Sequence, residues 1–267
     1  MLGGGIVQLS IFWDFYFALC IATIGIWYWL EDRSEIAKIR QFLYYFALVL
    51  LTIVLVGPVA HNAINYFWIH MVQHILLMML ISPLLILGSP FKLLLNSKFL
   101  VLRKITKAFI KVKLIRNLFK PQVGFAIFLI ALIGTHFSPL ANAAINNPNL
   151  HVLELIIFLY AGLIYYYPVL EGNPRPFPVP HHVRVGSLFV MMLPETMTGF
   201  FLYSGNILLH DAHNHMGMDM SSMIDPLKDQ HIGGALMWSM GMIIDTIWIV
   251  LAARDWLAHE QALSGDK

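Results

Sequence analysis

Seven apolar runs divide this chain, and they constrain its fold more than any other feature. The runs cover residues 6–30, 41–60, 66–89, 121–140, 150–169, 184–206 and 231–253. At a rise of 1.5 Å per residue, about 20 helical residues cross a hydrocarbon core of roughly 30 Å. Within lipid, an open chain can satisfy its backbone polar groups only by forming helices. The sequence therefore predicts an all-α, polytopic integral membrane protein with seven transmembrane helices.

The composition supports this class. With 58% hydrophobic and 12% charged residues, the chain is too apolar for a soluble globular domain. Its first residues, MLGGGIVQLSIFWDF, lack the positive stretch and the cleavage site of a signal peptide, so we expect them to belong to the first span. The sequence has no internal repeat, low-complexity linker or second domain. We expect a single seven-helix membrane domain over residues 1–267.

The basic residues predict the orientation of the chain. Of the 17 Lys and Arg residues, all except Lys228 fall in the segments that follow spans 1, 3, 5 and 7. Because basic residues collect in cytoplasmic loops, we expect the N-terminus outside and the C-terminus in the cytoplasm. The basic segment 92–120 also carries apolar residues at helical spacing. We interpret it as a helix that faces lipid headgroups, and not as a surface for nucleic acid.

Histidines on four spans are expected at a similar depth beneath the outer surface: His70, His74, His136, His151 and His231. His70 and His74, in HMVQH, are one turn apart on one helix face. Glu154 lies three residues after His151, so it can ligate a metal beside that histidine or orient its ring. Imidazole suits copper or zinc. The alternative is that these histidines form interhelical hydrogen bonds, and for His61 at a helix end that is the better interpretation.

The loop HDAHNHMGMDMSSM, residues 210–223, joins spans 6 and 7 on the expected outer side. Its candidate ligands are His210, His213, His215, Met216, Met218, Met220 and Met223. An exposed loop gains nothing from apolar thioethers, whereas thioethers with imidazoles bind copper and favour Cu(I) over Cu(II). We expect an extracytoplasmic copper-collecting segment; the alternative is an ordinary polar turn. Cys20 is the only cysteine, so no disulfide, CxxC pair or iron–sulfur framework is available.

Four segments carry a family resemblance. HMVQHILLMMLISPLLILGSP (70–90), THFSP (135–139), HVLELIIFLYAGLIYYYPVL (151–170) and DQHIGGALMW (229–238) resemble the CtaG-type assembly factors of caa3-type cytochrome c oxidase, in order and in spacing. The resemblance implies a seven-helix protein of the bacterial cell membrane that helps to build a haem–copper oxidase by supplying copper. It implies an oxidase subunit, an extracytoplasmic copper chaperone and the lipid bilayer as partners, no nucleic acid, and no enzymatic activity.

The resemblance also extends to single residues. The matching positions are His70, Gln73, His74, His136, His151, Glu154, Asp229, Gln230, Gly233, Gly234, Met237 and Trp238. Among these we expect metal contacts from the histidines and Glu154, with Met237 and the nearby His231 as further candidates. Gln73, Asp229 and Gln230 are expected to support the ligands. Gly233 and Gly234 suit close packing of helices in a bilayer.

Two other functions are open at this stage. A copper transporter would use intramembrane carboxylates, and Asp14, Glu195 and Asp245 are expected to face the bundle interior. A b-type haem protein would use histidines on facing helices, although several histidines and methionines at one depth favour copper. An enzyme is the least favoured class, because the sequence has neither a nucleophile–base pair nor a nucleotide-binding loop.

Overall fold

The computed structural model describes residues 3–63, 65–138, 143–144, 147–170, 179–209 and 224–265, with side chains described from residue 11 onward. Every regular element in these ranges is a helix, which confirms the all-α prediction. The elements are α1 (Gly3–Leu30), α2 (Lys38–Leu55), α3 (Pro58–Ala63), α4 (Phe67–Ile75), the π-helix η1 (Leu76–Ile81), α5 (Ser82–Leu87), α6 (Pro90–Leu95), α7 (Leu100–Lys111), α8 (Lys113–Leu118), α9 (Pro121–His136), α11 (Pro148–Val169), α12 (His181–Ser204) and α13 (Pro226–Gly265).

Six helical stretches are long and apolar enough to cross a membrane, so the chain is a multi-pass membrane protein. They are Ile11–Leu30, Lys38–Ala63, Phe67–Leu87, Pro148–Val169, His181–Ser204 and Pro226–Ser264. The run expected at 121–140 forms α9, whose 16 residues rise about 24 Å, less than a hydrocarbon core of roughly 30 Å. A seventh crossing and the orientation of the termini stay predictions.

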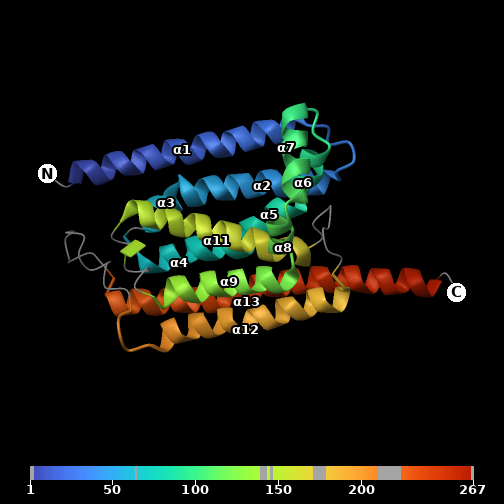
Figure 1. Ribbon diagram of the computed structural model, residues 1–267. Coiled ribbons are helices and arrows are strands. Elements are labelled where there is room, and N and C mark those ends of the chain that lie inside the picture. The colour runs from blue at the N-terminus through green and yellow to red at the C-terminus, as the bar shows by residue number, and fades with distance from the viewer. Residues whose placement is uncertain are drawn as a thin grey trace.

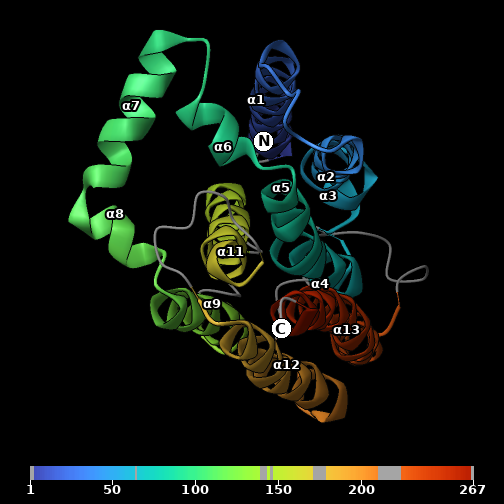
Figure 2. The same ribbon diagram turned by 90° about the vertical axis from the view of Figure 1, so that its right-hand side faces the viewer.

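The long helices run side by side, and an end-on view places the α4–α5 stretch between α2, α11 and α13 (Figures 1 and 2). α11 packs against α9 and against the continuous α4–η1–α5 stretch, while α13 packs along both α12 and α4. The bundle has two unlike ends. We call the end where α4, α11 and α13 begin the histidine end, and the end where α7 runs across the long helices the basic end (Figure 1).

Large apolar side chains cover the outside of the bundle. Phe15 and Trp29 on α1 are 70% and 63% exposed, and Phe42 on α2 is 62% exposed. A soluble monomer rarely exposes a continuous apolar surface of this kind, whereas in a bilayer such side chains contact acyl chains. The outer faces of α1 and α2 are therefore lipid-facing surfaces.

The helix through the middle of the bundle changes type at Pro83. Proline has no N–H to donate, so the Met79 carbonyl loses its partner one turn earlier in an α-helix. The chain widens into η1 just before this point, and the Trp248 indole N–H donates to the Met79 carbonyl at 2.8 Å. The Ser82 hydroxyl lies 2.8 Å from the Leu77 carbonyl. The Trp248 side chain from α13 and the Ser82 side chain of the helix itself thus add to the backbone hydrogen bonding of the widened turn.

Gly162 allows α11 to approach η1 closely. A Cβ at this position would lie 2.4 Å from the Met78 carbonyl oxygen and 2.6 Å from the Ser82 hydroxyl. We expect Gly162→Ala to destabilise the protein by about 1–3 kcal/mol through overpacking, which lowers the midpoint of thermal unfolding in detergent. Gly134→Ala is the matched helical control, since a Cβ there meets nothing within 4 Å. Equal midpoints for the two variants would contradict this account of the packing.

The three carboxylates expected inside the bundle differ in their environment. Glu195 and Asp245 are each 2% exposed, so the expectation is confirmed for them. Asp14 is partly exposed, and its Oδ2 atom lies 3.2 Å from Nε2 of His61 on α3. Asp14 therefore belongs to the α1–α3 contact at the edge of the bundle, and not to its interior.

Candidate metal centre

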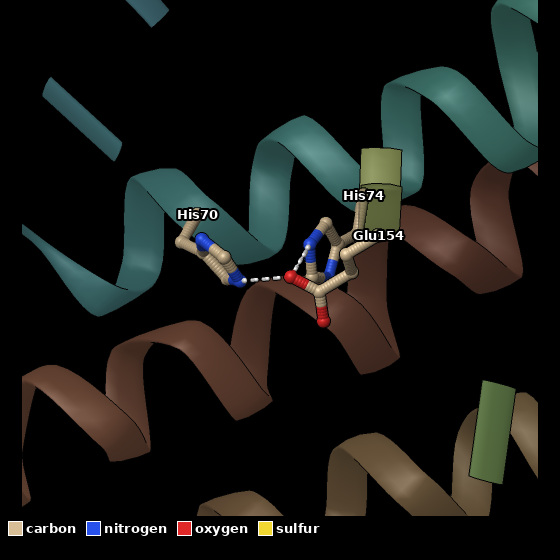
Figure 3. A group of neighbouring side chains, drawn as sticks. All are labelled: His70, His74 and Glu154. Atoms are coloured by element: carbon tan, nitrogen blue, oxygen red, sulfur yellow. Dashed lines mark ion pairs between the residues drawn. The ribbon is translucent and has the colours of Figure 1, made fainter. Parts of the chain in front are cut away.

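Two imidazoles of α4 and one carboxylate of α11 meet at the histidine end of the bundle. Nε2 of His70 and Nε2 of His74 each lie 3.6 Å from the same oxygen, Oε2 of Glu154. Figure 3 shows both rings turned toward this oxygen from successive turns of α4. The exposed fractions are 4%, 4% and 2%, so water has almost no access to the three side chains. We call His70, His74 and Glu154 the triad.

The spacing within the triad suits a shared cation better than hydrogen bonds. A separation of 3.6 Å is too long for an N–H···O bond. Two ligands that each lie about 2.0–2.1 Å from one tetrahedral ion would be about 3.4 Å apart, close to the observed value. One nitrogen or oxygen atom from each member of the triad lies within 4.8 Å of the others. Neither ring nitrogen of His74 nor Oε2 of Glu154 has a hydrogen-bond partner among the described residues, which is rare for buried polar atoms.

His136, at the end of α9, offers a further donor beside the triad. Its ring lies 5.7 Å from the ring of His74, measured between centroids. Its Nδ1 atom lies 2.7 Å from the Leu132 carbonyl oxygen, which can only accept, so Nδ1 carries the proton. This tautomer leaves a lone pair on Nε2, which is buried and has no hydrogen-bond partner in the described part of the chain. His136 is thus preset as a neutral metal ligand.

His151 is held beside the triad by Gln73. The Gln73 amide donates from Nε2 to the Val54 carbonyl at 2.8 Å, so its Oε1 atom is the acceptor that faces Nε2 of His151 at 3.2 Å. His151 Nε2 therefore carries a proton in this arrangement. The His151 ring stacks on His70 with centroids 5.0 Å apart, and this contact helps to fix the orientation of the His70 ring.

The two further candidates on α13 lie in different places. Nε2 of His231 lies 2.9 Å from the Gly205 carbonyl oxygen at the end of α12, so this ring faces α12 and not the triad. Met237 is 6% exposed and lines a small cavity together with His74 and His136. The structure thus brings Met237 to the candidate centre and leaves His231 outside it.

Asp229 and Gln230 act on the framework around the centre. Asp229 accepts hydrogen bonds from the backbone N–H groups of Phe67 at 2.8 Å and Trp68 at 3.1 Å, so it caps the start of α4. Gln230 accepts from the Leu209 backbone N–H at 2.8 Å, and its amide Nε2 lies within hydrogen-bond distance of the Ile207 carbonyl oxygen. Both residues fix where α4 and the end of the α12 segment sit relative to α13.

Removing the cap is expected to destabilise α4. Asp229→Ala leaves two backbone N–H groups at the start of α4 without their acceptor, and the loss of a cap costs about 1–2 kcal/mol. We expect a lower midpoint of thermal unfolding for this variant. Asp225→Ala is the matched comparison and should cost less, because Asp225 caps the start of α13 through one hydrogen bond, from the Lys228 N–H, at an exposed site. An unchanged midpoint for Asp229→Ala would show that the cap has no role in positioning the helix that carries His70 and His74.

The glycines of the family-like segment serve close packing. A Cβ at Gly234 would lie 2.4 Å from the Tyr203 backbone nitrogen, and one at Gly199 would lie 2.7 Å from that of Trp238. α12 and α13 therefore touch along their backbones.

The predicted ligands of the loop lie outside the described residues: His210, His213, His215, Met216, Met218, Met220 and Met223.

Sequence reasoning missed part of the surroundings of the centre. A cavity of about 20 Å³ lies against His74 and His136, and Met71, Met78 and Met79 contribute to its wall. These methionines lie in an apolar span, where methionine usually fills gaps in the packing. Met71, His74 and Met78 follow one another at spacings of three and four residues, which places them on one helix face and is the signal that could have linked them.

Comparisons with known proteins connect this site to a family. The family model described as cytochrome c oxidase caa3 assembly factor (Caa3_CtaG) matches residues 23–259. A protein of Mycobacterium leprae is 26% identical over 213 residues, and proteins of Mycobacterium bovis and Mycobacterium tuberculosis are each 24% identical over 205 residues. All three bear the name "uncharacterized protein". Each alignment covers 74% of this chain and 31% of the relative, so the chain spans about a third of their length.

No solved structure matches the chain. The family match covers most of the sequence, including α4, α9, α11 and the α13 residues that surround the candidate centre. The chain therefore belongs to the cytochrome c oxidase caa3 assembly factor family.

Proposed function

We propose that this protein binds copper through the triad and His136 and passes the ion to a haem–copper oxidase subunit during assembly. The observation that carries the proposal is the Glu154 carboxylate, buried between two imidazoles at 3.6 Å from each. Oε2 of Glu154 accepts no hydrogen bond within the described residues, and a bound cation would offset the cost of burying its charge. Imidazole and thioether donors around it suit copper, and the thioether favours Cu(I) over Cu(II).

The proposal includes an orientation. The basic end would face the cytoplasm and the histidine end the outside of a bacterial cell membrane, with seven crossings, the N-terminus outside and the C-terminus inside. Copper would then arrive from an extracytoplasmic copper chaperone, and the protein would act without catalysing a reaction of its own. The chain spans about a third of the length of the curated relatives it matches, so the same activity for a whole protein of their length is also part of the proposal.

Metal analysis of the purified protein tests the proposal. We expect the wild-type protein, loaded with Cu(I) under anaerobic conditions, to retain about one copper ion at the triad after passage through a desalting column. The variant His70→Ala plus His74→Ala should lose that ion. His181→Ala plus His259→Ala is the matched control, because these two rings stack on each other at 4.9 Å near the opposite end of the bundle. Retention of copper by the first variant at the wild-type level would overturn the proposed site.

Copper transport is the second candidate, and one observation favours it. Glu195 and Asp245 continue the buried polar groups beyond the triad, toward the middle of α12 and α13. Uptake of Cu(I) into sealed vesicles that contain the protein would support transport, whereas copper that binds but stays outside supports assembly. A b-type haem fits poorly, because the cavity beside His74 and His136 has room for a single ion or water molecule, and not for a porphyrin.

The loop between α12 and α13 is proposed as a capture segment that passes copper to the triad. We expect Met216→Leu, Met218→Leu, Met220→Leu and Met223→Leu together to lower oxidase maturation when copper is scarce and to matter little when copper is plentiful. Thioethers raise the affinity of the loop for Cu(I), and capture of copper limits the rate of oxidase maturation only when copper is scarce. The measurement is oxidase activity in cells grown over a range of copper concentrations. An equal defect at all concentrations would mean that the loop has a structural or docking role.

A further inference from the structure

Six helical elements converge on the small cavity beneath the triad, and four of the side chains that line it are thioethers. These four, which we call the methionine chamber, are Met71, Met78, Met79 and Met237. Each is at most 6% exposed. The imidazoles of His74 and His136 line the same cavity, and its volume of about 20 Å³ is enough for one water-sized particle. Side chains that carry thioether and imidazole groups therefore surround a space that fits one ion.

One face of α13 packs against the helix that carries Met71 and Met79. Methionine usually fills irregular gaps in a core, and a gap filled in this way leaves no cavity. Here Gly233, Met237 and Gly241 follow at intervals of four residues on one face of α13. A Cβ at Gly233 would lie 2.8 Å from Cδ1 of Phe67 and 3.0 Å from Cγ of Met71, whereas one at Gly241 would make an ordinary contact, 3.9 Å from Sδ of Met79. Gly233 thus makes room for Phe67 and Met71 of α4, one turn before Met237.

The π-helix η1 explains how two consecutive residues reach one cavity. In an α-helix, neighbours in sequence point about 100° apart. A π-turn is wider, so the angle between consecutive side chains is smaller, and such turns occur often at functional sites. Met78 and Met79 both lie in η1 and both line the cavity. The Trp248 indole holds the Met79 backbone in this position through its hydrogen bond to the carbonyl.

Glu195 supplies a carboxyl group at the wall of the chamber. It comes from α12, lines the same cavity and is 2% exposed. Its carboxyl group interacts with that of Asp245 on α13. Neutral thioethers and imidazoles leave the charge of a bound monovalent cation uncompensated, and this acidic pair can compensate it by releasing one proton. The chamber therefore combines soft neutral donors with one acidic group.

We infer that the methionine chamber is a second copper position, selective for Cu(I), directly below the triad. His74 borders both positions, so the ion could pass from one to the other by exchanging ligands around one imidazole, with no change of oxidation state. Thioether donors and a site for one ion favour Cu(I) over Cu(II) or Zn(II). This inference rests on the proposed copper function and adds to it a place where Cu(I) is held.

X-ray absorption at the copper edge tests the chamber without disturbing it. The sample is the full chain loaded anaerobically with Cu(I), in which the four loop methionines Met216, Met218, Met220 and Met223 are replaced by leucine. We expect sulfur scatterers around copper, and the replaced loop cannot be their source. A spectrum with nitrogen and oxygen scatterers only would overturn the inference, even if copper is bound.

Substitution within the chamber gives the second measurement. In the loop-substituted protein, Met78→Leu plus Met79→Leu should weaken Cu(I) binding by about tenfold or more in competition with a colorimetric Cu(I) chelator, because leucine fills the space without a donor. Zn(II) binding should stay within about twofold, since it relies on imidazole and carboxylate. Met191→Leu is the matched control, because Met191 is 1% exposed and belongs to α12. Equal Cu(I) affinity in the chamber variant, or an equal loss in the control, would overturn the inference.

The two levels of the proposal can fail separately. If His70→Ala plus His74→Ala abolishes copper binding and the spectrum of the loop-substituted protein lacks sulfur, the triad is supported and the chamber is excluded. If the histidine variant, made in the loop-substituted protein, keeps copper with sulfur scatterers, the chamber is supported and the triad is excluded. The X-ray absorption test uses a protein whose chamber methionines are intact, so it gives a result even if Met78→Leu plus Met79→Leu does not fold.

Discussion

Glu154→Gln should weaken copper binding by about 100-fold or more and should stop oxidase maturation. Glutamine keeps the volume of the side chain but removes its charge, so the triad loses the anionic ligand that two imidazoles share. The change leaves a bound cation without charge compensation in a site that water hardly reaches. Loss of a supporting group alone typically costs 10–100-fold in metal affinity, and a direct ligand should cost more.

Two measurements check this result. Competition titration with a Cu(I) chelator gives the affinity of the purified variant, and the oxidase activity of cells that carry the variant reports maturation. Glu260→Gln is the control, because Glu260 is an exposed residue near the end of α13 whose contact is with Trp256. Wild-type affinity in Glu154→Gln would remove the carboxylate from the site, whatever the oxidase activity.

Trp248→Phe should destabilise the protein by about 2–4 kcal/mol. The indole N–H is the donor to the Met79 carbonyl, whose partner in the helix is missing because Pro83 has no N–H. Inside a membrane protein no water replaces the lost donor, and an unsatisfied buried carbonyl costs up to several kcal/mol. Trp256→Phe is the control, because its N–H donates to Glu260 at an exposed position, 3.1 Å away.

A double-mutant cycle isolates the cause. Pro83→Ala restores a backbone N–H one turn after Met79, so it should partly rescue Trp248→Phe and show a coupling energy between the two sites. The measurement is chemical or thermal unfolding of the wild type, the two single variants and the double variant in one detergent. Additive effects would mean that Trp248 stabilises the bundle by packing alone.

Much of the fold could be predicted because membrane insertion imposes a simple length requirement. The apolar runs gave the long helices, including α11 and α12, within a few residues. The end of α13 was less predictable: the expected span stops at residue 253, yet the helix continues to Gly265. Polar residues such as Arg254 and Glu260 end the apolar run without ending the helix, because the segment 254–264 contains neither Gly nor Pro.

The site was predictable only as far as spacing along one helix allows. The interval of four residues placed His70 and His74 on one face, and both lie in the triad. Glu154 was expected beside His151, three residues earlier, but it faces the two α4 histidines, while His151 turns to Gln73. Periodicity tells which residues share a face of a helix and leaves open which neighbouring helix that face meets.

The methionines beneath the triad could not be predicted from the same periodicity. In a regular helix, Met78 and Met79 would point in clearly different directions, so a pattern based on 3.6 residues per turn separates them. The Ser82–Pro83 pair predicts an interruption of the helix. Whether a kink, a break or a wider turn forms depends on partners such as Trp248, which lies 169 residues from Met79 in the chain.

The wide turn of η1 should also be detectable in an alignment of sequences. A π-turn contains more residues than the α-turn it replaces, so a chain with η1 and a chain with a regular helix there should differ by a one-residue gap when their sequences are aligned. The interval between the HMVQH motif and the Ser82–Pro83 pair is thus a structural marker. A relative that is one residue shorter in this interval should keep its histidines and lose the side-by-side placement of Met78 and Met79.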